Sequence, residues 1–469
     1  MPKVELTAGE AARDQFAAPT EDELAAFAST IGRLSRLSHD HPARLRAEHI
    51  AESFVRDGRK QRRKAQRLQD VAADAALLAG TATGALARRE DAPLPVPVAA
   101  PAPVGELRRP RRCYVCKGSY RQADGFYHQL CPDCARDNSA YRAISTDLRG
   151  RRVLLTGGRV KIGFQLALMM LRDGAELIVT SRFPQDTVRR FQAAPGSEGW
   201  LERLRVVGID LRDPRQVLGL CEELRAEGRP LDILVNNAAQ TVRRPPEAYA
   251  LLVAGESADE LPPAARRAIR HAPGFTAIPA PTNELTAGLA LPSTVAALAD
   301  EAGLLPDTAP SNSWSARLGQ LDPTEVLETQ LVNALAPALL CDRLLPLLLA
   351  APHPNRYIVN VTAVEGRFAV RHKTPGHPHT NMAKAALNML TRTSAAALAE
   401  QGVHMCAVDT GWITDENPAP KKARIAARGF RTPLDIVDGA ARVYHPIVQG
   451  EAGAPLSGVF LKDYQQAQW

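Results

Sequence analysis

The sequence predicts an α/β fold with a doubly wound parallel sheet, preceded by a helical region and a small cysteine-rich module. Two observations carry this prediction. Residues 151–181 read as strand, glycine turn, helix and strand, an order that requires parallel strands joined by a helical crossover. Four cysteines stand in two C-x-x-C pairs upstream of that unit. We therefore divide the chain into a helical region (1–91), a linker (92–110), a cysteine module (111–147) and the α/β domain (148–469).

The N-terminal region carries helical signals. Thr20 precedes three acidic residues, and apolar residues then recur at helical spacing. A second helix is predicted over residues 42–68, and it contains a basic run at residues 59–67. Such a run indicates contact with a nucleic-acid backbone or an acidic partner, or else a helix face in solvent. Residues 92–110 are rich in proline and alanine, which is typical of an extended linker.

The four cysteines have the spacing of a metal site. Cys113 and Cys116 form one pair and, after fourteen residues, Cys131 and Cys134 form the other. Two such turns bring four thiolates around one tetrahedral ion, so we predict a structural zinc site. Four thiolates complete the coordination shell and leave no open position for catalysis. The aromatic and basic residues of the module suit protein or nucleic-acid recognition, and packing against the following domain is the alternative.

The strand–turn–helix–strand unit organises the α/β domain. The apolar run Val153–Leu155 indicates a buried strand, which Gly157 and Gly158 interrupt. Apolar residues then recur at helical spacing from Ile162, and Gly174 follows the helix where a C-cap glycine belongs. A glycine turn at a helix N-terminus presents free N–H groups and the positive end of the helix dipole. These features suit a pyrophosphate.

Further motifs accompany this unit. They are Thr156–Gly163 at the turn, Asp210 after an apolar run, Asn236-Asn237-Ala238-Ala239 at a strand end, Asn333 on a helix capped by Asp322, Lys384 on a later helix, and Asp409–Thr414. Together they resemble, in order, the motifs of the short-chain dehydrogenase/reductase family, and the resemblance spans residues 148–469. It implies a Rossmann-like fold and an oxidoreductase that moves a hydride between a nicotinamide cofactor and a carbonyl or hydroxyl carbon of a small-molecule substrate.

The resemblance implies roles for individual residues. Asp210 matches the acid that contacts the adenine, Lys384 matches the catalytic lysine, and Asn333 matches the asparagine that supports a proton relay. The residues expected to bind the cofactor are Thr156, Gly157, Gly158, Arg159, Ile162, Gly163, Arg182, Asp210, Asn236, Ala238, Lys384, Gly411, Ile413 and Thr414.

Charge at the end of the second strand favours NADP(H) over NAD(H). An acid at this place takes the ribose 2′-hydroxyl of NAD, whereas a basic residue suits the 2′-phosphate of NADP. Here the strand ends in Thr180-Ser181-Arg182, and Arg159 and Lys161 add positive charge in the glycine turn. Because Lys161 stands where the family has a glycine, we expect a different turn or a displaced pyrophosphate.

Two of the family's catalytic positions are changed. Thr380 stands four residues before Lys384, where the family has its proton-donating tyrosine, and Ala363 stands at the serine position. A threonine hydroxyl is far less acidic than a phenol, and losing a positioned acid or base removes about 10²–10⁴ in rate. Thr362 is adjacent to Ala363, but neighbouring strand residues face opposite sides.

Three interpretations follow. In the first, the protein is an atypical oxidoreductase whose proton donor is His379 or His377, in a loop at the mouth of the site. In the second, it is a pseudoenzyme that binds NADP(H) without hydride chemistry and acts as a nucleotide-sensing regulator or scaffold. In the third, the cysteine module and the basic run bind nucleic acid or protein on a dehydrogenase-like platform.

A long insertion separates the Asn236 motif from the next helix of the family. Residues 240–321 exceed the family's usual connection by about 70 residues, with short helices predicted at 263–270 and 294–302. An ordered insertion is typical of a lid or an interface, with a surface loop as the alternative. Residues 458–464 resemble the family's last strand, and the tail after them can reach a neighbouring subunit. The resemblance also implies a homo-oligomer.

Composition excludes few function classes. The net charge of +7 permits contact with phosphates without requiring it. No uninterrupted apolar run reaches the roughly 18 residues of a membrane helix, and the start lacks the pattern of a signal peptide. We therefore expect a cytoplasmic protein with no membrane partner. Its other cysteines, Cys221, Cys341 and Cys406, are expected to be small core residues.

Overall fold

The chain divides into two units, Met1–Ala73 and Asp74–Trp469. The first is helical, and the second contains the sheet and the cysteine module. The computed structural model describes residues 18–95, 103–256, 261–278, 299–370 and 373–469.

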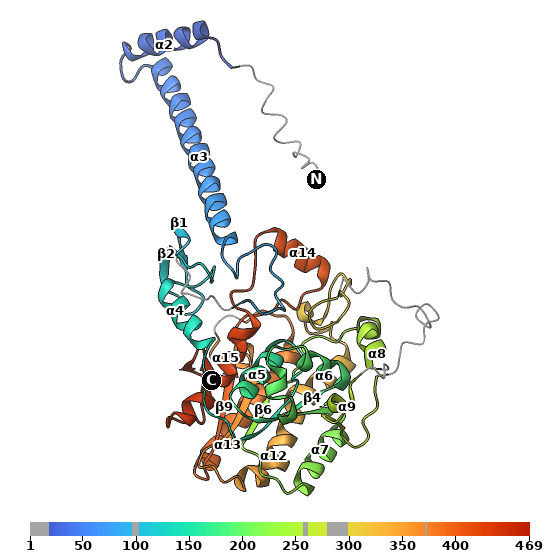
Figure 1. Ribbon diagram of the computed structural model, residues 1–469. Helices are drawn as coiled ribbons and strands as arrows, with labels where there is room; N and C mark the ends of the chain where they lie inside the picture. Colours follow the sequence, from blue (N-terminus) through green and yellow to red (C-terminus); the bar gives the residue numbers. More distant parts are fainter. Residues whose placement is uncertain (1–17, 96–102, 257–260, 279–298, 371–372) are drawn as a thin grey trace. The chain divides into compact units, whose positions relative to one another are not determined.

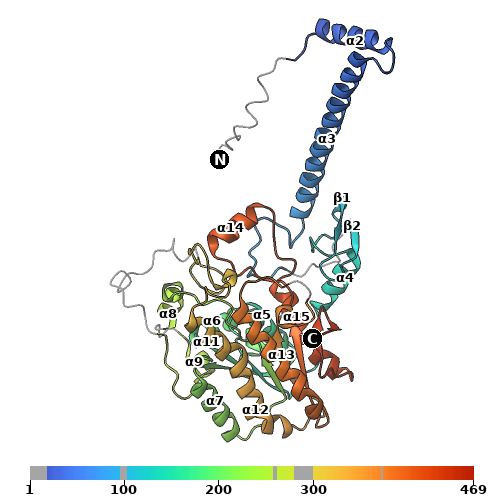
Figure 2. The same ribbon diagram turned by 180° about the vertical axis from the view of Figure 1, so that it is seen from behind.

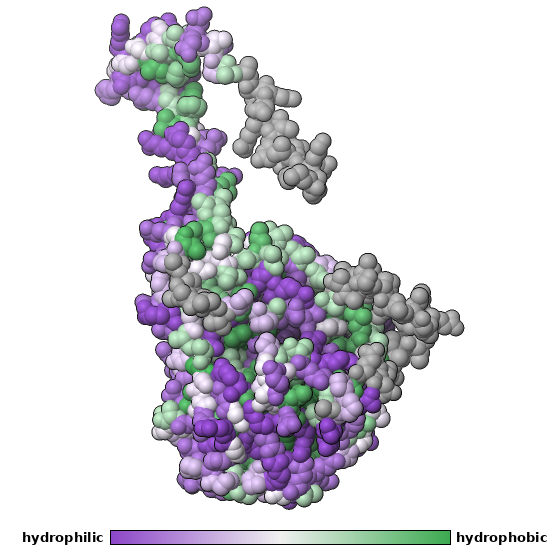
Figure 3. All heavy atoms as spheres, viewed as in Figure 1, coloured by the Kyte–Doolittle hydropathy of each residue, from purple (hydrophilic) through white to green (hydrophobic). Residues whose placement is uncertain are grey.

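The first unit is helical, as the sequence predicts. Helix α2 (Glu21–Ser35) begins at Thr20, whose hydroxyl accepts the N–H of Glu23 while the Glu23 carboxylate accepts the N–H of Thr20. Helix α3 (Pro42–Ala79) runs past the predicted end at residue 68, and its last residues belong to the second unit. Figure 3 shows apolar side chains exposed among hydrophilic ones on these helices, and Phe54 is 78% exposed. No residue of α2 is buried.

A nine-stranded sheet forms the centre of the second unit, in the order β11-β10-β9-β8-β6-β3-β4-β5-β7. All neighbours are parallel except β10 and β11. The strands are β3 (Arg152–Leu155), β4 (Glu176–Ser181), β5 (Leu204–Gly208), β6 (Ile233–Asn236), β7 (Ile269–His271), β8 (Arg356–Thr362), β9 (Val403–Asp409), β10 (Phe460–Lys462) and β11 (Gln465–Ala467). From β3 the chain builds first towards β5 and then, from β6, to the other side. A crevice for a ligand is expected at the carboxyl ends of strands at such a switch point.

Helices cover both faces of this sheet, which confirms the doubly wound prediction (Figures 1 and 2). Alternate residues of β3 serve two cores: Val153 and Leu155 pack with α5 and α15 on one face, and Leu154 packs with α7 and α12 on the other. The helices of this unit are α4 (Pro132–Tyr141), α5 (Lys161–Arg172), α6 (Pro184–Gln192), α7 (Pro214–Ala226), α8 (Ala250–Glu256), α9 (Pro263–Arg266), α11 (Pro323–Gln330), α12 (Ala336–Leu349), α13 (Pro378–Ala399), α14 (Ala419–Ala427) and α15 (Ile436–Glu451).

One helical segment, Pro323–Leu349, is long and apolar enough to cross a membrane by length and composition alone. Half of its most apolar window is buried inside the fold, where Leu340, Leu344 and Leu348 lie fully buried in the second core. Packing against the sheet therefore accounts for its apolar composition. The segment begins as predicted, because the Asp322 carboxylate accepts N–H groups of the first helical turn.

The insertion adds structure to one edge of the sheet. Its helix α9 ends at Arg266, and β7 then pairs in parallel with β5, so the helix predicted at 263–270 is too long and its last two residues belong to a strand. The sequence pattern could not show this because the edge of β5 provides the partner. The helix predicted at 294–302 lies partly outside the described residues, and Asp300–Gly303 forms a turn. At the opposite edge the Trp469 carbonyl accepts the N–H of Ala369, so the tail packs on its own chain.

The cysteine module is packed into the second unit. Strand β1 (Gly105–Arg112) pairs antiparallel with β2 (Ser119–Ala123), so residues 105–110 are strand rather than the end of a linker. The Asp74 carboxylate accepts the N–H groups of Arg108 and Arg109, a long-range contact that the local composition hides. Apolar residues of the module share one core with the segment that precedes α15. This core includes Leu107, Phe126, Tyr127, Leu130, Ile413, Leu434 and Ile436.

Candidate functional site

The glycine turn between β3 and α5 keeps the shape that a dinucleotide requires. Gly157 has a φ of 72°, and its N–H donates to the hydroxyl of Thr180 at 3.1 Å. Gly163 is indispensable, because a Cβ there would lie 2.0 Å from the carbonyl oxygen of Gly157. Lys161 has a φ of 54°, the left-handed region that favours glycine. The lysine therefore adopts a glycine-like backbone at this position, and its Nζ lies 3.6 Å from the carboxylate of Glu416.

The Lys161–Glu416 ion pair links the turn to the Asp409–Thr414 segment. Lys161 lowers the pKa of Glu416 to about 2, although burial acts in the opposite direction. The Thr414 hydroxyl donates to the same carboxylate at 2.9 Å. The predicted cofactor residue Thr414 thus positions a carboxylate that holds the glycine turn.

Asparagine side chains at the end of β6 have roles that differ from the prediction. Asn236 is buried and donates to the side-chain oxygen of Asn360 at 2.8 Å, so it braces two strands instead of lining the pocket. Asn237, which the sequence did not single out, donates to the carbonyls of Thr156 and Gly157. The Thr156 hydroxyl accepts the N–H groups of Asn237 and Ala238. Asn236 therefore points into the sheet, and Asn237 lines the pocket.

A cavity of about 370 Å³ opens at the carboxyl ends of β3 to β6. Of the predicted cofactor residues it is lined by Gly157, Arg159, Ile162, Gly163, Arg182, Asp210 and Ala238. The predicted residues that do not line it are Thr156, Gly158, Asn236, Lys384, Gly411, Ile413 and Thr414. The structure therefore brings half of the predicted cofactor residues together in one pocket. The predicted reaction residues are placed elsewhere around the sheet ends.

Most charged groups of this pocket are already paired. Arg159 contacts Asp186 at 2.7 Å, and the same guanidinium donates to the carbonyl of Ala302. Asp210 accepts several bonds from Arg212; although burial acts in the opposite direction, these bonds lower the pKa of Asp210. Asp210 is therefore a carboxylate held by its own chain.

Arg182 differs from these groups because it forms no ion pair with any described residue. It is half-buried, its guanidinium lies 5.1 Å from the ring centroid of Tyr249, and it donates to the Tyr249 hydroxyl at 3.3 Å. Tyr249 stacks on Phe183 with ring centroids 5.9 Å apart. The aromatic neighbours therefore hold a guanidinium that has no carboxylate in direct contact, although the more distant Asp210 feels its charge.

The insertion supplies part of the pocket wall, which sequence reasoning missed. Tyr249, Asp300 and Leu304 of the insertion line the cavity. The Glu256 carboxylate accepts the N–H groups of Gln185 and Asp186 at the start of α6. These contacts fix the described parts of the insertion against the end of β4. The composition of the insertion carried no signal for this role, because the contacts join residues far apart in the chain.

The reaction half of the site lacks its expected proton donor. Thr380 lies in the first turn of α13, is 5% exposed, and its hydroxyl has no hydrogen-bond partner among the described residues. Lys384 lies one turn further along; its Nζ donates to the carbonyl of Val361 at 2.9 Å, and burial lowers its pKa to about 8. Asn333 holds Gln240 by two bonds, accepting its N–H at 2.7 Å and donating to its carbonyl. Lys384 and Asn333 thus stand at two positions of the family's predicted proton relay, and Thr380 stands where the family has its tyrosine.

The two candidate histidines are not placed alike. His377 precedes α13 and stacks on Trp314 of the insertion, with ring centroids 4.1 Å apart. His379 is fully buried inside α13 rather than in a loop at the mouth of the site, and neither ring nitrogen has a partner. Burial lowers the pKa of His379, so it favours the neutral form. The prediction that His379 lies in a mouth loop is wrong, because Pro378 starts the helix one residue earlier.

The Asp409–Thr414 segment is braced by the cysteine module. The N–H of Trp412 donates to the hydroxyl of Tyr114 at 2.9 Å, and Tyr114 lies between Cys113 and Cys116. Ile413 is buried in the core that it shares with the module and with Ile162 of the glycine turn. Movement of the module would therefore be transmitted to both ends of the site.

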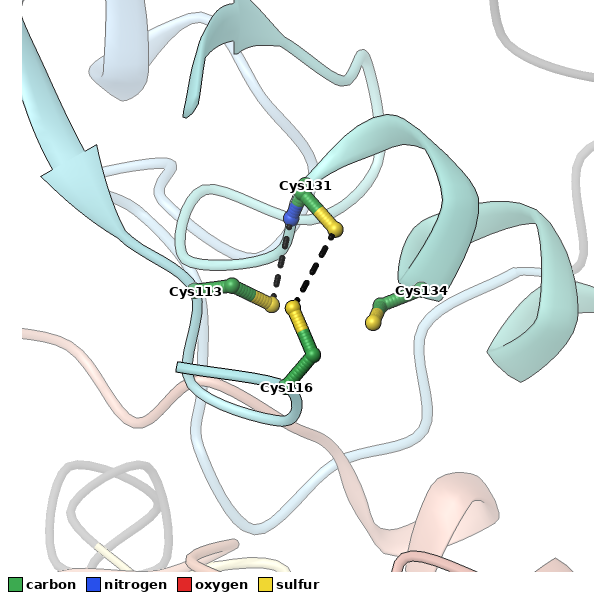
Figure 4. Close-up of side chains that lie close together, drawn as sticks. All are labelled: Cys113, Cys116, Cys131 and Cys134. Atoms are coloured by element: carbon green, nitrogen blue, oxygen red, sulfur yellow. Dashed lines mark hydrogen bonds between the residues drawn. The ribbon is translucent and has the colours of Figure 1, made fainter. Parts of the chain in front are cut away.

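The four cysteines converge as the spacing predicts. Their sulfur atoms all lie within 4.8 Å of one another (Figure 4). The Sγ atoms of Cys116 and Cys131 are 3.7 Å apart, and Zn–S bonds of about 2.3 Å in a tetrahedron place sulfurs about 3.8 Å apart. The N–H groups of Cys131 and Gly118 donate to Cys113 and Cys116 sulfurs, a pattern that suits thiolates. The donor set therefore fits a zinc ion.

Sequence comparison places the α/β domain in a known family. Residues 151–251 match the family described as short chain dehydrogenase, and residues 294–429 match the one described as enoyl-(acyl carrier protein) reductase. Together these matches span about half of the chain and include both halves of the site. The chain belongs to the short-chain dehydrogenase/reductase family.

Individual relatives cover different parts of the chain. Uncharacterized protein R665 of Acanthamoeba polyphaga mimivirus is 29% identical over 355 residues, which cover 72% of this chain and 71% of that protein. The peroxisomal 2,4-dienoyl-CoA reductase of Rattus norvegicus is 28% identical over 117 residues, only 34% of its length. A solved short chain dehydrogenase from Burkholderia cenocepacia in complex with NADP is 21% identical, with a TM-score of 0.44, over 67% of this chain and 97% of that chain.

Proposed function

We propose that this protein binds NADP(H) in the pocket at the carboxyl ends of β3 to β6. The glycine turn and the N-terminus of α5 receive the pyrophosphate, and the cavity beside β4 and β5 receives the adenosine. The single observation that carries the choice of nucleotide is the unpaired Arg182, held beside this cavity by Tyr249 and Phe183. A guanidinium with no carboxylate partner suits the 2′-phosphate that distinguishes NADP from NAD.

We propose further that the tyrosine-dependent proton transfer of the family is absent here. Thr380 and Ala363 replace the two hydroxyl donors, and the Thr380 hydroxyl is buried without a partner. The oxidoreductase function implied by the family therefore requires a different proton donor to a carbonyl or hydroxyl substrate. The alternative is a protein that senses NADP(H) without hydride transfer, and turnover of a carbonyl panel separates the two.

The cysteine cluster is proposed to hold a structural zinc ion. Four thiolates leave no open coordination position, so the ion's part is to fix the module. Tyr114 and the core shared with Ile413 then hold the Trp412 loop in place. His128 does not belong to this set, because its Nδ1 lies 2.8 Å from the Thr83 hydroxyl inside the fold.

Replacing Arg182 by alanine tests the choice of nucleotide. We expect Arg182→Ala to bind NADPH about ten- to a hundredfold more weakly, because a hydrogen bond to a charged group contributes about 1.5–3 kcal/mol. Its affinity for NADH should be unchanged. Titration of nucleotide fluorescence measures both, and Arg225→Ala, at an exposed position of α7, is the matched control. Equal loss of both nucleotides would contradict the assignment of Arg182 to the 2′-phosphate.

A second candidate function rests on the basic run of α3. Five basic side chains of this run are exposed, and none of them forms an ion pair with a described residue: Arg59, Lys60, Arg62, Arg63 and Lys64. Such a cluster favours a polyanion, and a nucleic acid is the partner it best fits. Binding that weakens steeply with salt and is lost in the Arg62→Gln/Arg63→Gln variant would support this function. Binding that is unchanged in that variant would exclude it.

A further inference from the structure

Glu365 lies close along the chain to Ala363, one of the two positions where the family's hydroxyl donors are missing. It follows Ala363 by two residues, in the 3₁₀ turn Val364–Gly366 at the carboxyl end of β8. This turn is pressed against α13, because a Cβ on Gly366 would lie 2.7 Å from the carbonyl carbon of Lys384. The residue that follows Glu365 is therefore packed directly against the backbone of Lys384.

The Glu365 side chain has no structural task in the described part of the chain. Its carboxylate accepts a hydrogen bond from the backbone N–H of Glu365 itself, and it forms no hydrogen bond or ion pair with the side chain of another described residue, although it is only partly exposed. The backbone beside it does the bracing: the N–H of Val364 donates to Asp409, and the Glu365 carbonyl accepts from Lys373. An acid that is partly buried without a partner side chain is unusual, since removing a charge from water requires compensation.

Charges on the surrounding elements keep this carboxyl protonated more easily than a free one. Burial raises the pKa of Glu365, and Asp409 of β9 raises it further, whereas His377 and Lys373 lower it. Glu365 is also the charged neighbour that acts on Lys384 of α13, partly opposing the burial that lowers the pKa of that lysine. The surroundings of Glu365 therefore favour its protonated form more than water does, which suits a group that gives a proton.

The other candidate donors are occupied or enclosed. Thr380 and His379 are buried without partners. The Tyr114 hydroxyl already accepts the N–H of Trp412, and burial raises its pKa to about 12. Glu365, which acts electrostatically on Lys384, is neither enclosed like these two side chains nor bonded like Tyr114.

We propose that the carboxyl group of Glu365 gives the proton to the oxygen of a carbonyl substrate, in place of the family's tyrosine. NADPH, when bound, would supply the hydride to the carbonyl carbon. The carbon–oxygen π electrons would then move to the oxygen, which takes the proton from Glu365. The products are NADP⁺, an alcohol and the Glu365 carboxylate, which regains a proton from solvent. The Lys384 ammonium stabilises that carboxylate between turnovers. This inference rests on the proposed binding of NADP(H).

The test compares the full-length protein with Glu365→Gln, a variant of almost the same shape. NADPH oxidation is followed with a panel of aldehydes and ketones, and NADPH affinity and melting temperature are measured beside it. We expect Glu365→Gln to keep both and to lose about 10²–10⁴ in rate. Glu365→Asp should recover part of the rate. Glu400→Gln, at an exposed position after α13, is the control that keeps the wild-type rate.

The pH profile separates a proton donor from a merely structural residue. The wild-type rate should fall as the pH rises through the raised pKa of Glu365, and this limb should vanish in Glu365→Gln. A Glu365→Gln variant with the wild-type rate would overturn the proposal, and so would a wild-type protein that binds NADPH and reduces no carbonyl. A wild-type protein that fails to bind NADPH would instead refute the proposed function itself.

Discussion

The two halves of the site have diverged differently from the family pattern. In the nucleotide half, every change is compensated: Lys161 takes a glycine-like φ, and Glu416 neutralises its charge. In the reaction half, nothing replaces the lost tyrosine hydroxyl directly. Thr380 stands at its position, and the buried Thr380 hydroxyl has no hydrogen-bond partner among the described residues. This difference is the reason for our proposal that the pocket binds a nucleotide while the proton donor beside it has changed.

The insertion and the cysteine module explain how the two halves can differ. The insertion contacts both halves, because Tyr249 lines the cavity and Trp314 stacks on His377. The module supports Trp412 through Tyr114. Long-range packing of this kind can hold a backbone in place when the local motif has changed. Four variants test whether the two halves of the site differ in this way.

Removing the support that both halves share should have the largest effect. We expect Cys116→Ser to lose zinc and, with it, much of the stability of the second unit, because a structural zinc site contributes roughly 10 kcal/mol or more in small modules. The loss should appear as a lower zinc content and a melting temperature lower by more than about 10 °C. Cys221→Ala, at a buried cysteine of α7, should keep the full zinc content. A Cys116→Ser variant with unchanged zinc and melting temperature would exclude a metal at this cluster.

A methyl group in the glycine turn should damage the nucleotide half alone. In Gly163→Ala the new Cβ would lie 2.0 Å from the Gly157 carbonyl and 2.6 Å from the Asn237 amide, so the turn must open. Overpacking costs about 1–3 kcal/mol, which corresponds to NADPH affinity about ten- to a hundredfold lower. Gly199→Ala, where no atom lies within 4 Å, is the control in the same titration. Unchanged affinity in Gly163→Ala would place the pyrophosphate elsewhere.

The buried lysine of the reaction half should make stability depend on pH. Burial lowers the pKa of Lys384 from 10.5 to about 8, so between these values the unfolded chain binds more protons than the folded one. Stability should therefore rise with pH through this window, by up to about 1.4 kcal/mol per unit. Urea denaturation at pH 7.5 and pH 9.5 should show a smaller rise in Lys384→Met than in the wild type. Lys60→Met, at an exposed position, should match the wild type, and equal slopes in all three would contradict the burial of Lys384.

The smallest effect is expected where the family has its tyrosine. Thr380→Val keeps the shape of the side chain and removes a buried hydroxyl that has no partner. Removing an unsatisfied polar group is neutral or stabilising, so the free energy of unfolding should change by less than about 1 kcal/mol. The rate of NADPH oxidation should be unchanged as well. A large loss of rate would mean that Thr380 moves the proton, and the comparison between the two halves would fail.

Much of the fold follows from local patterns in the chain. The run Val153–Leu155 alternates between two cores, the helix after Ile162 is amphipathic, and Asp322 caps its helix as expected. The cysteine spacing alone predicted the cluster. Local patterns failed where a partner from far along the chain decides: residues 105–110 became strand beside β2, and Ile269–His271 became strand beside β5.

For the candidate site, the chain by itself determined which chemistry is available, and the tertiary structure decided which groups can use it. The glycine turn, Arg182, Lys384 and the absent tyrosine are properties of the sequence, since each depends on residue type at a fixed spacing. Packing decided that Arg182 lies beside Tyr249 without a carboxylate partner, that His379 is enclosed, and that the turn of Glu365 is packed against Lys384. The physical reason is that burial and charge compensation are set by neighbours distant in sequence, which no local spacing encodes.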